Sequence, residues 1–124
     1  MRAEIKAILT PDVEDLSTYQ PDDPEIFGFL LQLLIGPKNA EGEESFQMMV
    51  CTPKWMLENF PKDRILLGSH HLIVFEYNYQ ALMKYLYRYV GTLDADTWQE
   101  LAQKVTQLGA WEFENYQNGE SRNE

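Results

Sequence analysis

The run from Phe27 to Ile35 restricts the fold of this chain more than any other segment. Its large apolar residues recur at every second position: Phe27, Phe29, Leu31, Leu33 and Ile35. This spacing places one row of side chains on a single face of a β-strand. Leu30 and Leu34 fall on the opposite face, so we expect that face to be partly covered as well. Gly36-Pro37 ends the strand.

Three further segments have strand patterns. Arg2 to Leu9 alternates, with Ala3, Ile5, Ala7 and Leu9 on one side. Ser45 to Cys51 forms a strand that pairs with the Phe27–Ile35 strand as a hairpin, through a turn over residues 38–44. His70 to Tyr77 is the candidate for a fourth strand.

Three helices are predicted. Thr52-Pro53 is a favourable start for a short helix to Asn59, because threonine caps free amides and proline suits the first helical position. A second helix runs from Asn78 to about Val90. Its apolar stripe consists of Ala81, Leu82, Tyr85, Leu86, Tyr89 and Val90. A last helix is capped by Asp94 or Asp96 and ends before Gly109, and its buried face comprises Trp98, Leu101, Ala102, Val105 and Leu108.

Strands precede helices in this order of elements. That order favours an α+β fold: an antiparallel sheet of about four strands with two to three helices packed on one face. The 124 residues suit a single domain, and no linker divides the chain. We expect a short extended segment over residues 111–116 and a frayed tail over residues 117–124.

The charge balance excludes several function classes. The chain has 10 basic and 20 acidic residues and a net charge of −10. Such a chain lacks the basic face that binds a nucleic-acid backbone or an anionic membrane surface. A single cysteine excludes an internal disulfide framework. The N-terminus has no apolar signal segment and no run is long enough to span a membrane, so we expect a cytoplasmic protein.

Cys51 is the one candidate nucleophile. It lies between a strand end and a helix start, where backbone amides lower a thiol pKa, but its neighbours Met48 to Val50 are apolar, which favours a buried structural thiol. His70 and His71 point to opposite faces of a strand and do not share a metal ion. The sequence contains no metal-binding, phosphate-binding or nucleophile motif, so we expect no metal and no cofactor.

The acidic residues gather in two loops. Residues 11–25 contain six acids, three prolines and no base, and residues 41–44 contain three more acids. No calcium-loop pattern is present. These acids are either solvated surface or an electrostatic docking surface for a basic partner.

Three segments resemble the immunity protein 8 family of bacterial polymorphic-toxin systems. They are F-L-L-Q-L-L-I-G-P (Phe29 to Pro37), E-S-F-Q-M-M-V-C-T-P-K-W (Glu44 to Trp55) and H-L-I-V-F-E-Y (His71 to Tyr77). The resemblance implies a small cytosolic α+β protein that binds a toxin domain and has no enzymatic activity. It carries no functional motif onto named positions.

Charge and resemblance together predict a docking surface for a basic, nuclease-like toxin. The residues predicted to contact it are Asp12, Glu14, Asp15, Tyr19, Asp22, Asp23, Glu25, Glu41, Glu43 and Glu44. Two alternatives belong to other classes. One is a small thiol-dependent enzyme that uses Cys51 with a histidine, and the other is a non-catalytic adaptor subunit.

Overall fold

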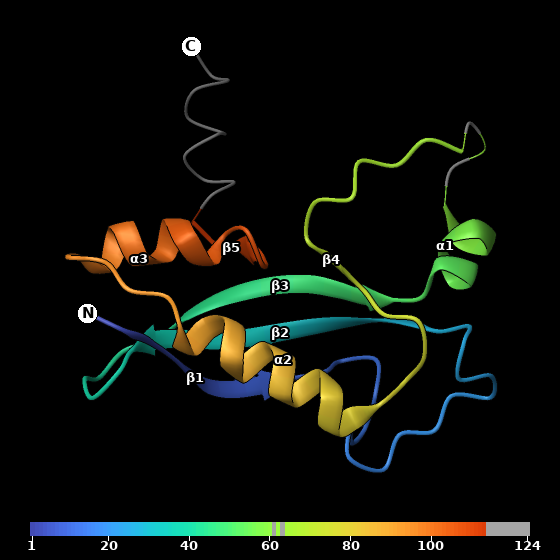
Figure 1. Ribbon diagram of the computed structural model, residues 1–124, viewed down its shortest axis with the longest axis horizontal. Coiled ribbons are helices and arrows are strands. Elements are labelled where there is room, and N and C mark those ends of the chain that lie inside the picture. The colour runs from blue at the N-terminus through green and yellow to red at the C-terminus, as the bar shows by residue number, and fades with distance from the viewer. Residues whose placement is uncertain (61, 63, 114–124) are drawn as a thin grey trace.

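The computed structural model describes residues 1–60, 62 and 64–113, and it has the predicted α+β class. Within these residues the sheet has five strands in the order β1-β2-β3-β4, with β5 also paired to β3 (Figure 1). The strands are β1 (Ala3–Leu9), β2 (Gly28–Pro37), β3 (Glu44–Cys51), β4 (His71–Ile73) and β5 (Ala110–Trp111). The helices are α1 (Pro53–Asn59), α2 (Tyr79–Gly91) and α3 (Trp98–Val105).

The period-two run forms β2, which is the central strand of an antiparallel β1-β2-β3 unit. The predicted hairpin of β2 and β3 is confirmed, with Gly28 opposite Cys51 and Ile35 opposite Glu44. Phe29, Leu31, Leu33 and Ile35 are at most 1% exposed, so this row forms the middle of the core. Leu30 and Leu34 are half-buried on the other face, as expected.

A bulge in β1 changes which of its residues face the core. The register shifts between Ile5 and Ala7, so that Ile8 lies opposite the buried Leu33. A bulge inserts one extra residue and reverses the alternation beyond it. The prediction that Leu9 lies on the same side as Ala3 and Ile5 was therefore wrong: Leu9 is exposed, and Ile8 packs against the core instead.

The fourth strand is shorter than predicted, and its direction differs from the antiparallel arrangement that was predicted. β4 covers His71 to Ile73 and is parallel to β3, because α1 forms a crossover between the two strands. β3 ends at Cys51, so residues beyond Val74 have no strand beside them. The chain then leaves the sheet, and the Tyr77 N–H donates to the carbonyl of Pro24 at 2.9 Å.

Helices α2 and α3 cover one face of the sheet, and α2 lies across the strands in Figure 1. Their buried residues join the core formed by β1, β2 and β3. The side chains contributed by the two helices are Leu82, Leu86, Val90, Leu101, Ala102 and Val105.

Helix α1 packs on the opposite face. Phe29 in β2 faces the core, so its neighbour Gly28 faces the other side of the sheet. A Cβ atom on Gly28 would lie 2.4 Å from the ring of Trp55, so this residue of α1 lies against that other side. Thr52 caps α1 as predicted, accepting a hydrogen bond from the Trp55 N–H. The apolar residues of α1 are only partly covered: Trp55 and Met56 are half-buried, whereas Leu57 is 62% exposed.

Helix α3 starts later than predicted. Thr97, and not Asp94 or Asp96, is the N-cap, and its hydroxyl accepts from the Glu100 N–H at 3.2 Å. The predicted buried face is confirmed for Leu101, Ala102, Val105 and Leu108. Of the extended segment predicted over residues 111–116, only Trp111 belongs to a strand, β5, and residues 112–113 form a turn. Residues 114–116 and the predicted tail lie outside the described part of the chain. In that described part no helix has the length and hydropathy to cross a membrane.

Candidate partner-binding surface

The two groups of acidic residues lie at opposite ends of β2 (Figure 1). The acidic loop, residues 11–25, joins β1 to β2. The hairpin loop, residues 38–43, joins β2 to β3 and carries Glu41 and Glu43, with Glu44 at the start of β3. β2 has 10 residues, and at ~3.3 Å per residue it separates the loops by about 30 Å. They therefore form two surfaces and not one.

Several acids of the acidic loop hold the loop in shape. An Asp12 carboxylate oxygen accepts from the Leu30 N–H at 2.9 Å, beyond the end of β1. Asp15 accepts from both the N–H and the hydroxyl of Ser17, and these bonds lower the pKa of Asp15. Asp23 accepts from the Glu25 N–H at 2.9 Å. The bonds of Asp15 and Asp23 close local turns, and the bond of Asp12 fixes the loop to β2, so the loop has a defined backbone.

Two further predicted residues have partners elsewhere in the fold. Glu25 forms an ion pair with Lys54 of α1, which raises the pKa of Lys54. Glu44 accepts a hydrogen bond from the indole N–H of Trp111 in β5. Both carboxylates therefore connect a loop end to another element of the fold.

Four of the predicted acids remain open to solvent. No hydrogen bond or ion pair joins their carboxylates to another residue that the structure describes, and all four are exposed. They are Glu14 and Asp22 in the acidic loop and Glu41 and Glu43 in the hairpin loop.

Tyr19 anchors the acidic loop to the core. Its half-buried ring lies edge-on to Phe29 at 5.7 Å and to Tyr77 at 5.0 Å between centroids. Burial raises the pKa of Tyr19, and the nearby charge of Asp22 adds to the effect. The Tyr77 hydroxyl donates to the carbonyl of Leu16 at 2.5 Å. Tyr19 therefore has a packing role in the fold.

A hollow of about 640 Å³ lies between the acidic loop and α2. Glu14 and Asp15 line it from the loop, and Tyr79 and Tyr87 line it from α2. Carboxylates beside aromatic rings suit a lysine or arginine side chain, which gains both an ion pair and a cation–π contact.

Cys51 is a buried, neutral thiol. The side chain is fully buried, and burial raises its pKa to about 11. The two imidazoles bond elsewhere: His70 Nε2 lies 2.8 Å from the carbonyl of Thr106, and His71 Nδ1 lies 2.7 Å from that of Ser69. The structure thus gives the buried structural thiol that the apolar neighbours favoured. No group of three or more potential ligands among the described residues is placed to hold a metal ion.

Sequence reasoning missed an apolar groove of about 430 Å³ between the segment 72–78 and α2. Phe75 is 78% exposed there, and Tyr85 is 50% exposed. The prediction that Tyr85 lies on the buried stripe of α2 was wrong, because the helix turns Leu82, Leu86 and Val90 to the core and leaves Ala81 and Tyr85 at its side. The sequence contains a signal for this groove: the apolar stripe of α2 is wider than a helix needs to contact a single core.

Comparison with known proteins identifies a family. The family model of immunity protein 8 matches residues 3–116 of the 124-residue chain. No curated protein and no solved structure matches it. The match spans every helix and strand described above. The chain therefore belongs to the immunity protein 8 family, and membership implies an immunity protein that binds a cognate bacterial toxin.

Proposed function

We propose that this protein neutralises its toxin by direct binding, with the acidic loop docking on a basic region of the toxin. Domains that attack nucleic acids carry basic surfaces, because their substrate is a polyanion. An acidic inhibitor presents a field of the same sign as that substrate and steers the encounter. We infer a basic, nuclease-like toxin that is met in the cytoplasm, and inhibition without catalysis by this chain.

The observation that carries the proposal is the acidic loop itself. It has six acids and no base over residues 11–25, and its backbone is held by Asp12, Asp15 and Asp23. A loop that is already ordered loses less conformational entropy when it binds. The hollow beside Glu14 and Asp15 gives a basic side chain a place to enter. The hairpin loop, at the far end of β2, adds to the long-range field.

The test is rescue of cells from the toxin domain encoded beside this chain. Wild-type protein is expected to restore growth and to co-purify with the toxin. The double variant Glu14→Lys/Asp22→Lys is expected to associate with the toxin at least ~10-fold more slowly at low salt. Neither carboxylate has a hydrogen-bond or ion-pair partner among the residues that the structure describes, so the fold is expected to remain intact.

The matched control is Glu41→Lys/Glu43→Lys, which changes the net charge by the same amount at the far end of β2. We expect it to slow association only about 2-fold, since it alters the overall field and not the contact. Equal effects of the two double variants would contradict docking through the acidic loop. Cell death despite good expression of the wild-type protein would contradict neutralisation of this toxin.

A further inference from the structure

The apolar groove beside α2 has the form of a binding site for a large side chain. Ile73, the last residue of β4, and Phe75, two residues further on, line one side of it, and Ala81 and Tyr85 line it from α2. Ile73 is 45% exposed and Phe75 is 78% exposed. The floor contains Val50 and Leu72, which lie opposite each other in the sheet. Neighbouring apolar groups that remain exposed in this way mark interaction surfaces.

The local fold gives no structural reason for Phe75 to be exposed. β4 ends at Ile73, and the next backbone bonds are made by Val74 to Cys51 and by Tyr77 to Pro24. Both Val74 and Tyr77 pack against the core, whereas the Phe75 side chain between them projects outward. A polar residue at this position would satisfy the same backbone path.

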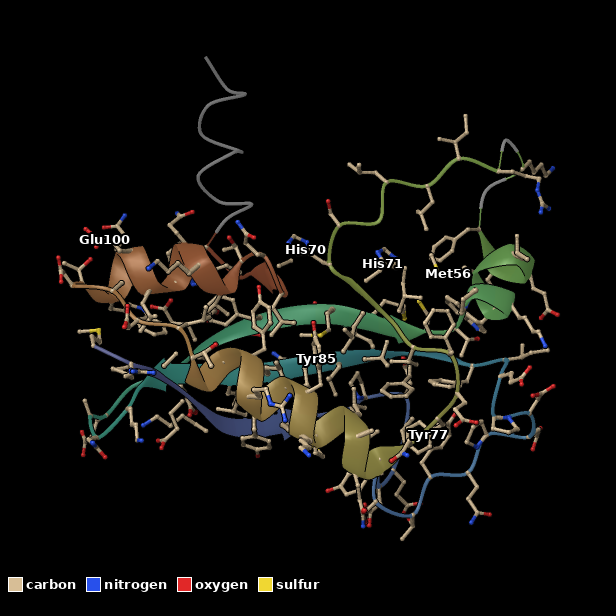
Figure 2. All side chains as sticks on the ribbon, in the orientation of Figure 1. Met56, His70, His71, Tyr77, Tyr85 and Glu100 are labelled. Atoms are coloured by element: carbon tan, nitrogen blue, oxygen red, sulfur yellow. The ribbon has the colours of Figure 1, made fainter. Side chains whose placement is uncertain are left out.

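The groove is continuous with the acidic loop through Tyr77. This residue lines the groove, its N–H donates to Pro24, and its hydroxyl donates to Leu16. Figure 2 shows Tyr77 beside the loop that follows β1, and Tyr85 on the neighbouring face of α2. Glu76 is the one charged residue among the described residues that line the groove. An apolar centre with an acidic border is therefore present on one side of the molecule.

We propose that the groove receives a large apolar side chain of the toxin, from a segment in which basic residues flank that side chain. This inference rests on the proposed function and names the contact that it uses. The flanking bases reach Glu76 and the acidic loop, while the apolar group displaces water between Phe75 and Tyr85. Binding energy concentrates on aromatic anchors at the centre of an interface, and charged borders contribute chiefly to the rate of encounter.

The proposal is tested by measuring association and dissociation rates of the toxin complex for Phe75→Ala and Tyr85→Ala. Each is expected to raise the dissociation rate by about 30-fold and to change the association rate by less than ~2-fold. Phe75→Leu retains apolar bulk and is expected to raise the dissociation rate less than either alanine variant. Both side chains are at least half exposed, and thermal melting verifies that the variants fold.

Leu67→Ala is the matched control, because Leu67 is 84% exposed and does not line the groove. It is expected to leave both rates unchanged. If the wild-type protein binds the toxin and the Phe75→Ala and Tyr85→Ala complexes dissociate at the wild-type rate, the groove assignment alone is overturned. Failure of the wild-type protein to bind the toxin would overturn the proposed function together with it. A wild-type dimer that Phe75→Ala converts to monomer, with unchanged toxin binding, would assign the groove to a second copy of this chain.

Discussion

Asp12 and Glu14 stand two positions apart in the acidic loop, and their carboxylates have different roles. Asp12 accepts the Leu30 N–H and so continues the edge of the sheet where β1 has ended. Glu14 borders the hollow beside α2. The sequence predicts both as acidic loop residues, because charge and loop composition are the same for both. Which carboxylate meets a backbone amide depends on the path of the loop, and that path is set by the buried Val13 and Leu16.

The buried thiol of Cys51 leads to a pH-dependent stability. Its pKa in the folded protein is about 11, against an ordinary value of 9.0. Between these values the unfolded chain loses the proton and the folded chain keeps it, so the free energy of unfolding falls as the pH rises from 9 to 11. Below pH 9 the thiol is neutral in both states and contributes nothing to the pH dependence.

Urea unfolding of the reduced protein between pH 8 and pH 11 measures this effect. Wild type is expected to lose about 2 kcal/mol more than Cys51→Ala over that range. Burial also raises the pKa of Tyr77, to about 12, but that residue is present in both proteins and cancels in the comparison. Parallel stability curves would show that the thiol does not titrate as described. Full rescue of cells from the toxin by Cys51→Ala would also argue against a thiol-dependent enzyme.

The strands with a clear two-residue period were predictable, and those set by tertiary pairing were not. β2 formed where Phe29, Leu31 and Leu33 alternate, because burial of that row selects one register. The segment from His71 to Tyr77 has the composition of a longer strand, yet only three residues pair. The limit comes from β3, which ends at Cys51, and a single-sequence pattern carries no information about where a partner strand stops.

Gly36 lies where the hairpin loop packs closely against β2. A Cβ atom at this position would lie 1.9 Å from the carbonyl oxygen of Gly42, so the backbone of the hairpin loop must move to admit any side chain. Gly36→Ala is expected to destabilise the protein by about 2–3 kcal/mol, as overpacking does elsewhere. Thermal or urea unfolding measures this change in the free energy of unfolding.

Gly91→Ala is the control for Gly36→Ala. A Cβ atom at Gly91, the last residue of α2, meets no heavy atom within 4 Å. Alanine is favoured over glycine in a helix, so this variant is expected to be neutral or more stable by up to ~1 kcal/mol. Similar losses for both variants would indicate that the close approach at Gly36 is relaxed in solution.

For the whole molecule, the net charge of −10 and the separation of the two acidic surfaces make different contributions to binding. The total charge acts over the Debye length, which is about 30 Å at 0.01 M salt and about 8 Å at 0.15 M. At low salt the hairpin loop therefore still contributes to the attraction of a basic partner docked at the acidic loop. At physiological salt it is screened, and the acids nearest the contact dominate.

This screening predicts how the toxin association rate changes with ionic strength. The rate constant of the wild-type protein is expected to fall ~10-fold or more between 0.01 M and 0.5 M salt, while the dissociation rate changes much less. Glu41→Lys/Glu43→Lys is expected to slow association at 0.01 M salt and to match wild type at 0.15 M. Glu14→Lys/Asp22→Lys is expected to remain slower at both. Stopped-flow mixing at three salt concentrations measures all three proteins. An association rate that is independent of salt would mean that the acidic residues serve solubility and not recognition. The apolar groove would then have to bind the partner without electrostatic steering.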